Sequence, residues 1–159
     1  MAATFSGLDA IDVTILEILQ KAGRTKRNDL AEAVGLSLPS VSERLRKLEE
    51  AGVVTGYHAR LNHRLLGKDI TAFITVYVDS SRHYGQFLEH AKPLDEVLEV
   101  HAVTGEGTHL LKVRTQDTAS LEKLLAKIQS WGGVVSTRTS LVLSSAKETA
   151  RIRLEATRE

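Results

Sequence analysis

Residues 35–52 read GLSLPSVSERLRKLEEAG and decide the fold of the first part of the chain. Ser37 is suited to cap a helix that tolerates Pro39 in its first turn and ends at Gly52. Apolar residues inside it recur at steps of three and four, which predicts one buried helical face. That face consists of Val41, Leu45, Leu48 and Ala51.

Two further helices are predicted upstream. The same apolar period predicts one over residues 8–22, stopped at Gly23. Thr25 is expected to cap a second, short helix that ends at Gly35 in a left-handed conformation. Residues 35–37 form the short turn between this second helix and the helix that Ser37 caps. Two short helices joined by such a turn form a helix-turn-helix, whose second helix enters the major groove of DNA. Residues 53–61 further predict two short β-stretches, as a winged module requires.

The charge distribution indicates the same partner. The whole chain has a net charge of +1, but residues 21–64 hold nine bases against five acids. Such an excess on a helix-turn-helix favours double-stranded DNA. The side chains expected nearest the base edges are Ser40, Glu43, Arg46 and Lys47. Those expected nearer phosphates are Ser37, Ser42 and Arg44, with Arg24, Lys26 and Arg27 as salt-dependent contacts.

The charged side chains of this helix have an alternative role to DNA contact. Arg44, Arg46 and Lys47 can instead pair with Glu43, Glu49 and Glu50 along the helix surface.

The second part of the chain has a different period. After Gly67 the apolar residues alternate, which predicts a strand over residues 70–78. A helix ended by Pro93, strands over 97–104 and 109–115, a helix capped by Asp117 and a last strand over 134–143 follow. The order βαββαβ is the ferredoxin-like arrangement, with both helices on one face of an antiparallel sheet. Phe73 and Tyr77 fall on the other face, which favours a second copy of the chain as its cover.

The chain is therefore expected to be an α+β protein with an N-terminal winged helix-turn-helix and a C-terminal ferredoxin-like βαββαβ antiparallel sheet. The expected domains are residues 1–53, a linker strand over 54–68, a sheet domain over 69–149 and a tail over 150–159. The Arg- and Glu-rich end after Lys147 is interpreted as a short helix or a mobile end without assigned function. No apolar run is long enough to cross a bilayer, and residues 1–7 lack a basic patch followed by an apolar core, so the protein is expected to be cytoplasmic.

Several motifs, weak singly but specific in this order and spacing, resemble the Lrp/AsnC family of bacterial and archaeal transcription factors. In the first part these are residues 8–12 with Ile15 and Leu16, then 35–37, 41–45 and 48–54. In the second part they are Leu66 and Gly67, then 103–105 and 110–113. The resemblance covers nearly the whole chain.

The resemblance implies a regulator that dimerises through its sheet, often assembles into octamers, and binds small effectors, typically amino acids, where dimers meet. The implied effector loop is Thr104, Gly105, Glu106, Gly107 and Thr108. The family commonly has an aspartate where this chain has Thr108, and that change deletes a charged acceptor for an ammonium group. Backbone amides at Gly105 and Gly107 can still hold a carboxylate. The alternative is a plain tight hairpin whose glycines only supply positive φ.

Two other classes remain as alternatives. Sirohaem decarboxylases have a similar architecture, and His101, His109 and Arg114 are the residues that such an enzyme would use here. A modulator that has lost DNA binding is the second alternative. The chain has no cysteine, and we find no paired-carboxylate or nucleophile–base motif and no phosphate-binding glycine loop. We therefore expect no catalysis, metal or cofactor, apart from a possible amino-acid effector.

Overall fold

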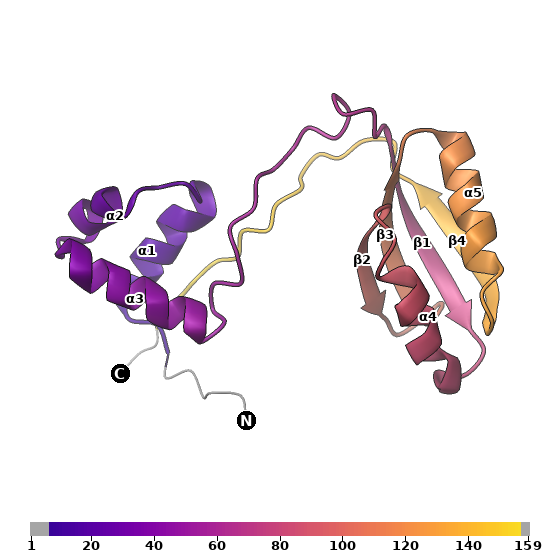
Figure 1. The fold of residues 1–159 in the computed structure, drawn as a ribbon, viewed down its shortest axis with the longest axis horizontal. Helices are drawn as coiled ribbons and strands as arrows, with labels where there is room; N and C mark the ends of the chain where they lie inside the picture. Colours follow the sequence, from indigo (N-terminus) through magenta and orange to yellow (C-terminus); the bar gives the residue numbers. More distant parts are fainter. Residues whose placement is uncertain (1–6, 157–159) are drawn as a thin grey trace. The chain divides into compact units, whose positions relative to one another are not determined.

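The computed structural model describes residues 7–156 (Figure 1). Residues 7–60 together with 147–156 form one compact unit, called here the helical unit, and residues 61–146 form a second, the sheet unit. The expectation that rests on the sequence pattern of residues 1–7 concerns residues that, apart from Gly7, lie outside the described part of the chain. The last three residues of the tail lie outside it as well. In residues 7–156 there is no helix of the length and apolarity that a membrane span requires.

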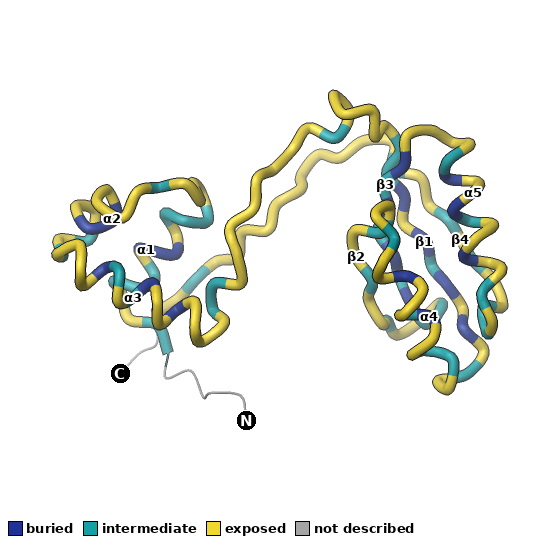
Figure 2. The backbone as a smooth tube through the Cα atoms, viewed as in Figure 1, coloured by how far each residue is buried: buried dark blue, intermediate teal, exposed yellow. Residues whose placement is uncertain are grey.

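Three helices build the helical unit: α1 (Ala10–Lys21), α2 (Arg27–Val34) and α3 (Leu38–Glu50). Their apolar faces meet in one core, where Ile15, Leu30, Val41 and Leu45 are buried (Figure 2). The periodicity of the sequence thus predicts these buried positions correctly, but Ala51, expected on the buried face of α3, is exposed because it caps the C-terminal end of the helix. Ser37 caps α3 as expected, and Gly35 ends α2 with φ +67°, a conformation that glycine adopts without steric cost. The helix-turn-helix is confirmed.

Two local predictions in this unit are wrong. Thr25 does not cap α2, because the helix begins at Arg27 and the Thr25 hydroxyl donates to the Ala22 carbonyl oxygen at 2.6 Å. The two short strands expected around Gly56 are not formed either, since residues 53–61 have no strand pairing. Instead, the backbone N–H groups of Val53 and Val54 both donate to the carbonyl oxygen of Leu48, which folds this segment back onto the end of α3.

The sheet unit contains β1 (Ile70–Val78), a 3-10 turn η1 (Ser81–His83), α4 (Tyr84–Ala91), β2 (Val97–Ala102), β3 (His109–Thr115), α5 (Thr118–Gln129) and β4 (Val134–Leu141). The strand order is β2-β3-β1-β4, and all three pairings are antiparallel. This is the predicted ferredoxin-like arrangement. β2 and β4 each end two residues before the predicted boundary.

Alternation along β1 separates the two faces of this sheet. Ala72, Ile74 and Val76 are fully buried on the face that α4 and α5 cover, where they pack with Phe87 and Leu124. On the opposite face, Phe73 and Tyr77 are 37% and 49% exposed. The register places Phe73 beside Lys112 of β3 and Ser140 of β4. Within the sheet unit, residues 61–146, no element covers this face, and it carries these two aromatic side chains on its central strand β1.

Candidate DNA-binding and effector sites

The helix α3 is held by its apolar side and by its cap. Val41, Leu45 and Leu48 are buried against the rest of the helical unit. The Ser37 and Ser40 hydroxyls are hydrogen-bonded to each other at 2.8 Å at the start of the helix. Because one side of α3 is anchored, its other side is exposed, and that side carries Ser40, Glu43, Arg46 and Lys47. The four side chains predicted to lie nearest base edges therefore share one solvent-facing surface.

Arg46 is paired along the helix. Its Nε and Nη2 atoms donate to the two carboxylate oxygens of Glu43 at 2.9 and 2.7 Å, and Nη1 donates to Glu50 at 2.5 Å. Hydrogen bonds to the two carboxylates raise the pKa of Arg46 above its ordinary value, and the Arg46 hydrogen bond lowers the pKa of Glu43. Lys47 lies 3.9 Å from the same Glu43 carboxylate. The alternative left open by the sequence, pairing along the helix surface, is realised here for Arg46.

Arg44 has a different role. Its Nη1 atom donates to Asp9 at 2.6 Å and to Asp12 at 2.9 Å, which ties α3 to the first turn of α1. Asp9 and Asp12 also form a reciprocal capping box at the start of α1. The Asp9 and Asp12 hydrogen bonds raise the pKa of Arg44. The Arg44 guanidinium is thus bonded to α1 within the helical unit. Sequence spacing could not indicate this contact, because it joins residues more than thirty positions apart.

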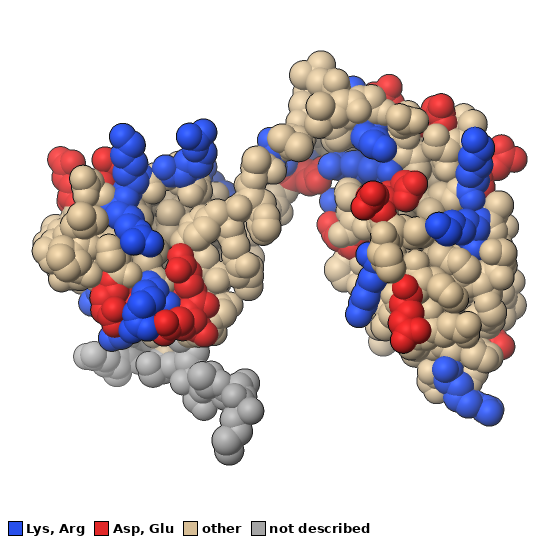
Figure 3. Space-filling view, viewed as in Figure 1, with Lys and Arg blue, Asp and Glu red and all other residues tan. Residues whose placement is uncertain are grey.

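The remaining residues predicted to contact phosphates lie just before α2 and at its first position. Arg24, Lys26 and Arg27 are exposed, and none of them forms an ion pair with any residue in the part of the chain that is described. Ser42 is half-buried on α3. Figure 3 shows that basic and acidic side chains are interspersed over the helical unit. Cations without an ion pair among the described residues are therefore found just before α2 and at its start, while those on α3 lie beside aspartates or glutamates.

One polar contact near α3 was missed from the sequence. The Tyr57 hydroxyl donates to Glu49 at 3.0 Å, and burial together with this glutamate raises the pKa of Tyr57. The contact connects the segment after α3 back to the helix end.

The predicted effector loop is tied to the end of β1. The backbone N–H of Thr108 donates to the Val76 carbonyl oxygen at 2.8 Å, and its hydroxyl accepts from the Val78 N–H at 3.1 Å. The same hydroxyl lies 2.9 Å from Nδ1 of His109. Thr108 is thus engaged within the sheet unit, so the side chain that replaces the family's aspartate has a structural role.

The other side of the loop is tied to β4. The Arg138 guanidinium is paired with the Glu106 carboxylate, and both side chains are largely exposed. Gly105 and Gly107 have φ values of +97° and +81°. A Cβ atom at Gly107 would meet the side chain of Thr75 and lie 3.1 Å from the Val76 carbonyl oxygen, whereas one at Gly105 would meet nothing. Gly107 is therefore required both for its backbone conformation and for close approach to β1.

His109 lies in the core beside this loop. Its side chain is 1% exposed and packs against the rings of Tyr84 and Phe87, with ring centroids 4.8 and 4.6 Å away. Burial lowers the pKa of His109 below its ordinary value of 6.5. His101, by contrast, is exposed and lies 3.1 Å from Glu99. The histidines and Arg114, suggested for a tetrapyrrole site, therefore do not converge: His109 is enclosed, and Arg114 donates to Thr71 across the sheet.

An anchored helix with an exposed polar side, in a helix-turn-helix joined to a ferredoxin-like domain, defines a DNA-binding protein with an appended sensing or assembly domain. Residues 8–55 match a winged helix-turn-helix DNA-binding domain, and residues 71–152 match the Lrp/AsnC ligand binding domain. The chain belongs to the Lrp/AsnC family of transcriptional regulators.

Similar proteins are regulators of bacteria and archaea. The HTH-type transcriptional regulator FL11 of Pyrococcus abyssi is 34% identical over 145 residues, covering 91% of this chain and 95% of that protein. A transcriptional regulator of Neisseria meningitidis in complex with L-methionine has a TM-score of 0.87 at 32% identity, covering 92% of this chain and 96% of that one. The feast or famine regulatory protein of Mycobacterium tuberculosis, also complexed with L-methionine, has a TM-score of 0.85 at 31% identity, covering 91% and 98%.

Proposed function

We propose that this regulator reads double-stranded DNA with the exposed side of α3. The observation that carries the proposal is the anchoring of α3 by its buried face, which leaves Ser40, Glu43, Arg46 and Lys47 together on the opposite surface. Arginine and lysine recognise guanine, and glutamate accepts from the amino group of cytosine. Arg24, Lys26 and Arg27 supply phosphate contacts, and the Ser37 and Ser42 hydroxyls lie nearer the backbone than the bases.

Arg44 is assigned a supporting part in this interface. Its hydrogen bonds to Asp9 and Asp12 orient α3 on α1, so it acts on DNA by positioning the reading helix. Because the Arg44 guanidinium is engaged with these carboxylates, we assign direct phosphate contacts to the other cations.

The protein acts as a dimer, and further assembly to an octamer is part of the same proposal. Phe73 and Tyr77 on the uncovered face of the sheet support a second copy as the cover. A single small reader has weak affinity at physiological salt, and joining two readers on a twofold site raises it through effective concentration. The family membership and the exposure of the Phe73 and Tyr77 side chains support this assembly.

A small amino acid is proposed as the effector, bound at Thr104, Gly105, Glu106, Gly107 and Thr108. Two similar structures are complexes with L-methionine, which supports this ligand class. Backbone N–H groups at the two glycines suit a carboxylate, and Glu106 is the acceptor available for an ammonium group, at the cost of its pairing with Arg138. An effector shifts assembly only through its different affinity for the two arrangements.

The regulator is proposed to be non-catalytic and cytoplasmic. The enclosed His109 and the engaged Arg114 argue against the tetrapyrrole enzyme. The exposed side of α3 argues against a modulator without DNA binding.

Selection of genomic fragments by the purified protein, with and without a pool of amino acids, tests the function. We expect enrichment of a short twofold-symmetric sequence, and a shift of the enriched set when the amino acids are added. Absence of enrichment from a folded, oligomeric sample would refute DNA reading. Identical enrichment in both arms would refute amino-acid sensing while leaving DNA reading intact.

A further inference from the structure

Residues 147–154 follow the last strand of the sheet unit but belong to the helical unit. Residues 147–156 form no helix, so the first of the two alternatives expected from the sequence, a short helix, is wrong for them. Ala150, Ile152 and Leu154 line a groove on the helical unit. Arg151 and Arg153 alternate with them, which is the period of a strand with one apolar side.

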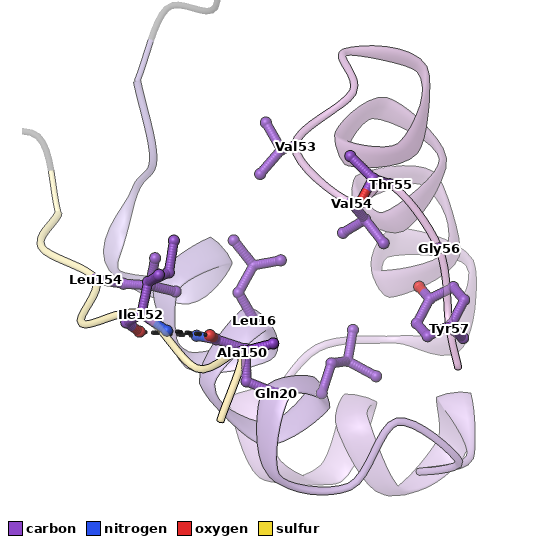
Figure 4. Close-up of a pocket in the computed structure, with 11 residues that line it drawn as sticks. Leu16, Gln20, Val53, Val54, Thr55, Gly56, Tyr57, Ala150, Ile152 and Leu154 are labelled. Carbon is purple, nitrogen blue, oxygen red and sulfur yellow. Dashed lines mark hydrogen bonds between the residues drawn. The ribbon is translucent and has the colours of Figure 1, made fainter. Parts of the chain in front are cut away.

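Gln20 of α1 holds the middle of this segment. Its side-chain Nε2 donates to the Ile152 carbonyl oxygen at 3.1 Å, and its Oε1 accepts from the Ile152 N–H at 2.8 Å (Figure 4). The carboxamide thus satisfies both backbone groups of one residue, as a neighbouring strand would. Such pairing fixes the position of Ile152 along α1, while its side chain lies at the rim of the groove and stays 68% exposed.

Apolar contacts line the same place. The groove has a volume of about 330 Å³ and is bordered by Leu16 of α1, by Val53, Val54 and Tyr57 of the segment after α3, and by Ile152 and Leu154 (Figure 4). The C-terminal segment therefore contributes one wall of an apolar groove whose other walls come from the helix-turn-helix region.

A second polar contact lies where the chain leaves the helical unit and returns to it. The chain leaves this unit after Arg60 and comes back at Lys147. The Arg60 guanidinium donates to the carbonyl oxygen of Glu148 at 2.8 Å. The outgoing and returning segments are thus bonded to each other at this point.

We propose that residues 147–154 form a strap, a docked strand that ties the helical unit to the sheet unit by a second chain connection. A unit held by one flexible linker reorients freely, whereas one held by two clasped segments loses much of that freedom. The tail docks readily because its attachment gives it a high effective concentration at the groove. Displacements of the sheet unit are thereby transmitted to the reading helix, and this last step rests on the proposed function.

Docking is tested by hydrogen exchange in the full-length protein. We expect the Ile152 amide to exchange at least about tenfold more slowly than in an unstructured peptide. Gln20→Met removes the carboxamide at similar shape, and Ile152→Asp places a charge at the groove, so both should abolish protection of the Ile152 amide, which donates to Gln20. Glu155→Gln is the matched control and should leave it unchanged. An unprotected tail in the wild type, or protection that survives both variants, would overturn the proposal.

The tie between the units is tested by time-resolved anisotropy. The chain has no cysteine, so Glu32→Cys on α2 accepts a single fluorophore. We expect Gln20→Met and Ile152→Asp to lower the residual anisotropy of the label, with Glu155→Gln unchanged. Equal residual anisotropy in all proteins would show that the tail is docked but does not restrain the helical unit, which contradicts the strap. Neither readout uses DNA, so failure of the strap is distinguishable from failure of DNA reading.

Cross-linking shows whether the strap closes within one chain. Lys21→Cys combined with Arg151→Cys, two exposed positions that border one groove and leave Gln20 and Ile152 in place, should give a linked product with a short bifunctional thiol reagent that runs as a monomer on a denaturing gel. A linked dimer would mean that the tail docks on a second copy, and would overturn the proposal.

Discussion

Arg46 and Glu43 form a bidentate ion pair on the exposed side of α3, with Nε to Oε2 at 2.9 Å and Nη2 to Oε1 at 2.7 Å. Glu50 binds the remaining nitrogen of the same guanidinium. The cation that we propose reads a base is therefore paired with two carboxylates in the free protein. If α3 reads DNA as proposed, Arg46 has to leave Glu43 and Glu50 to reach a base, and we expect this to favour duplexes that offer hydrogen-bond partners to both Arg46 and Glu43.

Removal of one glutamate should weaken this selectivity. Glu43→Gln frees one side of Arg46 and deletes a negative charge that repels phosphate, so we expect affinity for duplexes of unrelated sequence to rise roughly threefold at low salt. Fluorescence anisotropy titrations with such a duplex measure the change. Glu17→Gln removes the same charge from α1 and should change affinity less. Equal effects of the two substitutions would show that only net charge matters.

Arg44 should matter for stability. Arg44→Met breaks the hydrogen bonds to Asp9 and Asp12. Because solvent screens these partly exposed charges, we expect the free energy of unfolding of the helical unit to fall by only about 1 kcal/mol. Urea unfolding followed by circular dichroism measures it. Arg46→Met serves as the matched control, because ion pairs between side chains that are about half exposed contribute little to stability. Loss of stability in the control alone would reverse the roles given to the two arginines.

Acid should destabilise the sheet unit through His109. Burial holds the folded-state pKa of His109 below 6.5, so the unfolded chain takes up the proton first. The stability is complete above that value and is lost as the pH falls through 6.5 toward the folded-state pKa. Unfolding measured at about pH 7.5 and 5.5, where most carboxylates stay ionised, should show a decrease. His109→Gln should flatten this dependence. A wild-type profile that is flat, or one unchanged by the substitution, would contradict the burial argument.

The uncovered sheet face should carry the dimer. Phe73→Asp places a charge at the centre of that face, and we expect sedimentation velocity to show monomers that retain the circular dichroism spectrum of the wild type. Ala119→Asp adds the same charge at an exposed position in the first turn of α5 and should leave assembly intact. Dimers that persist in Phe73→Asp would place the interface elsewhere.

Much of the fold could be predicted from local patterns. The buried faces of α1 and α3, the alternation along β1 and the caps at Ser37 and Asp117 depend on neighbours a few residues away. The false cap at Thr25 shows the limit of that reasoning, since its hydroxyl found another acceptor.

Features of the site that depend on distant residues were not accessible to the sequence. The Arg44 contact with Asp9 and the Gln20 contact with Ile152 join segments far apart in the chain. The structural engagement of Thr108 likewise depends on β1, which lies some thirty residues earlier. Residue type and spacing offered several partners for each of these side chains, and only the packed fold selects one.

The central claim is that α3 reads DNA through Arg46, and affinity for a selected site tests it most directly. The wild type and Arg46→Met are titrated in parallel against the twofold-symmetric duplex and an unrelated duplex at one salt concentration. We predict that Arg46→Met loses about tenfold or more in affinity for the selected duplex and little for the unrelated one, with its fold unchanged. Equal binding of the selected duplex by both proteins would contradict the account.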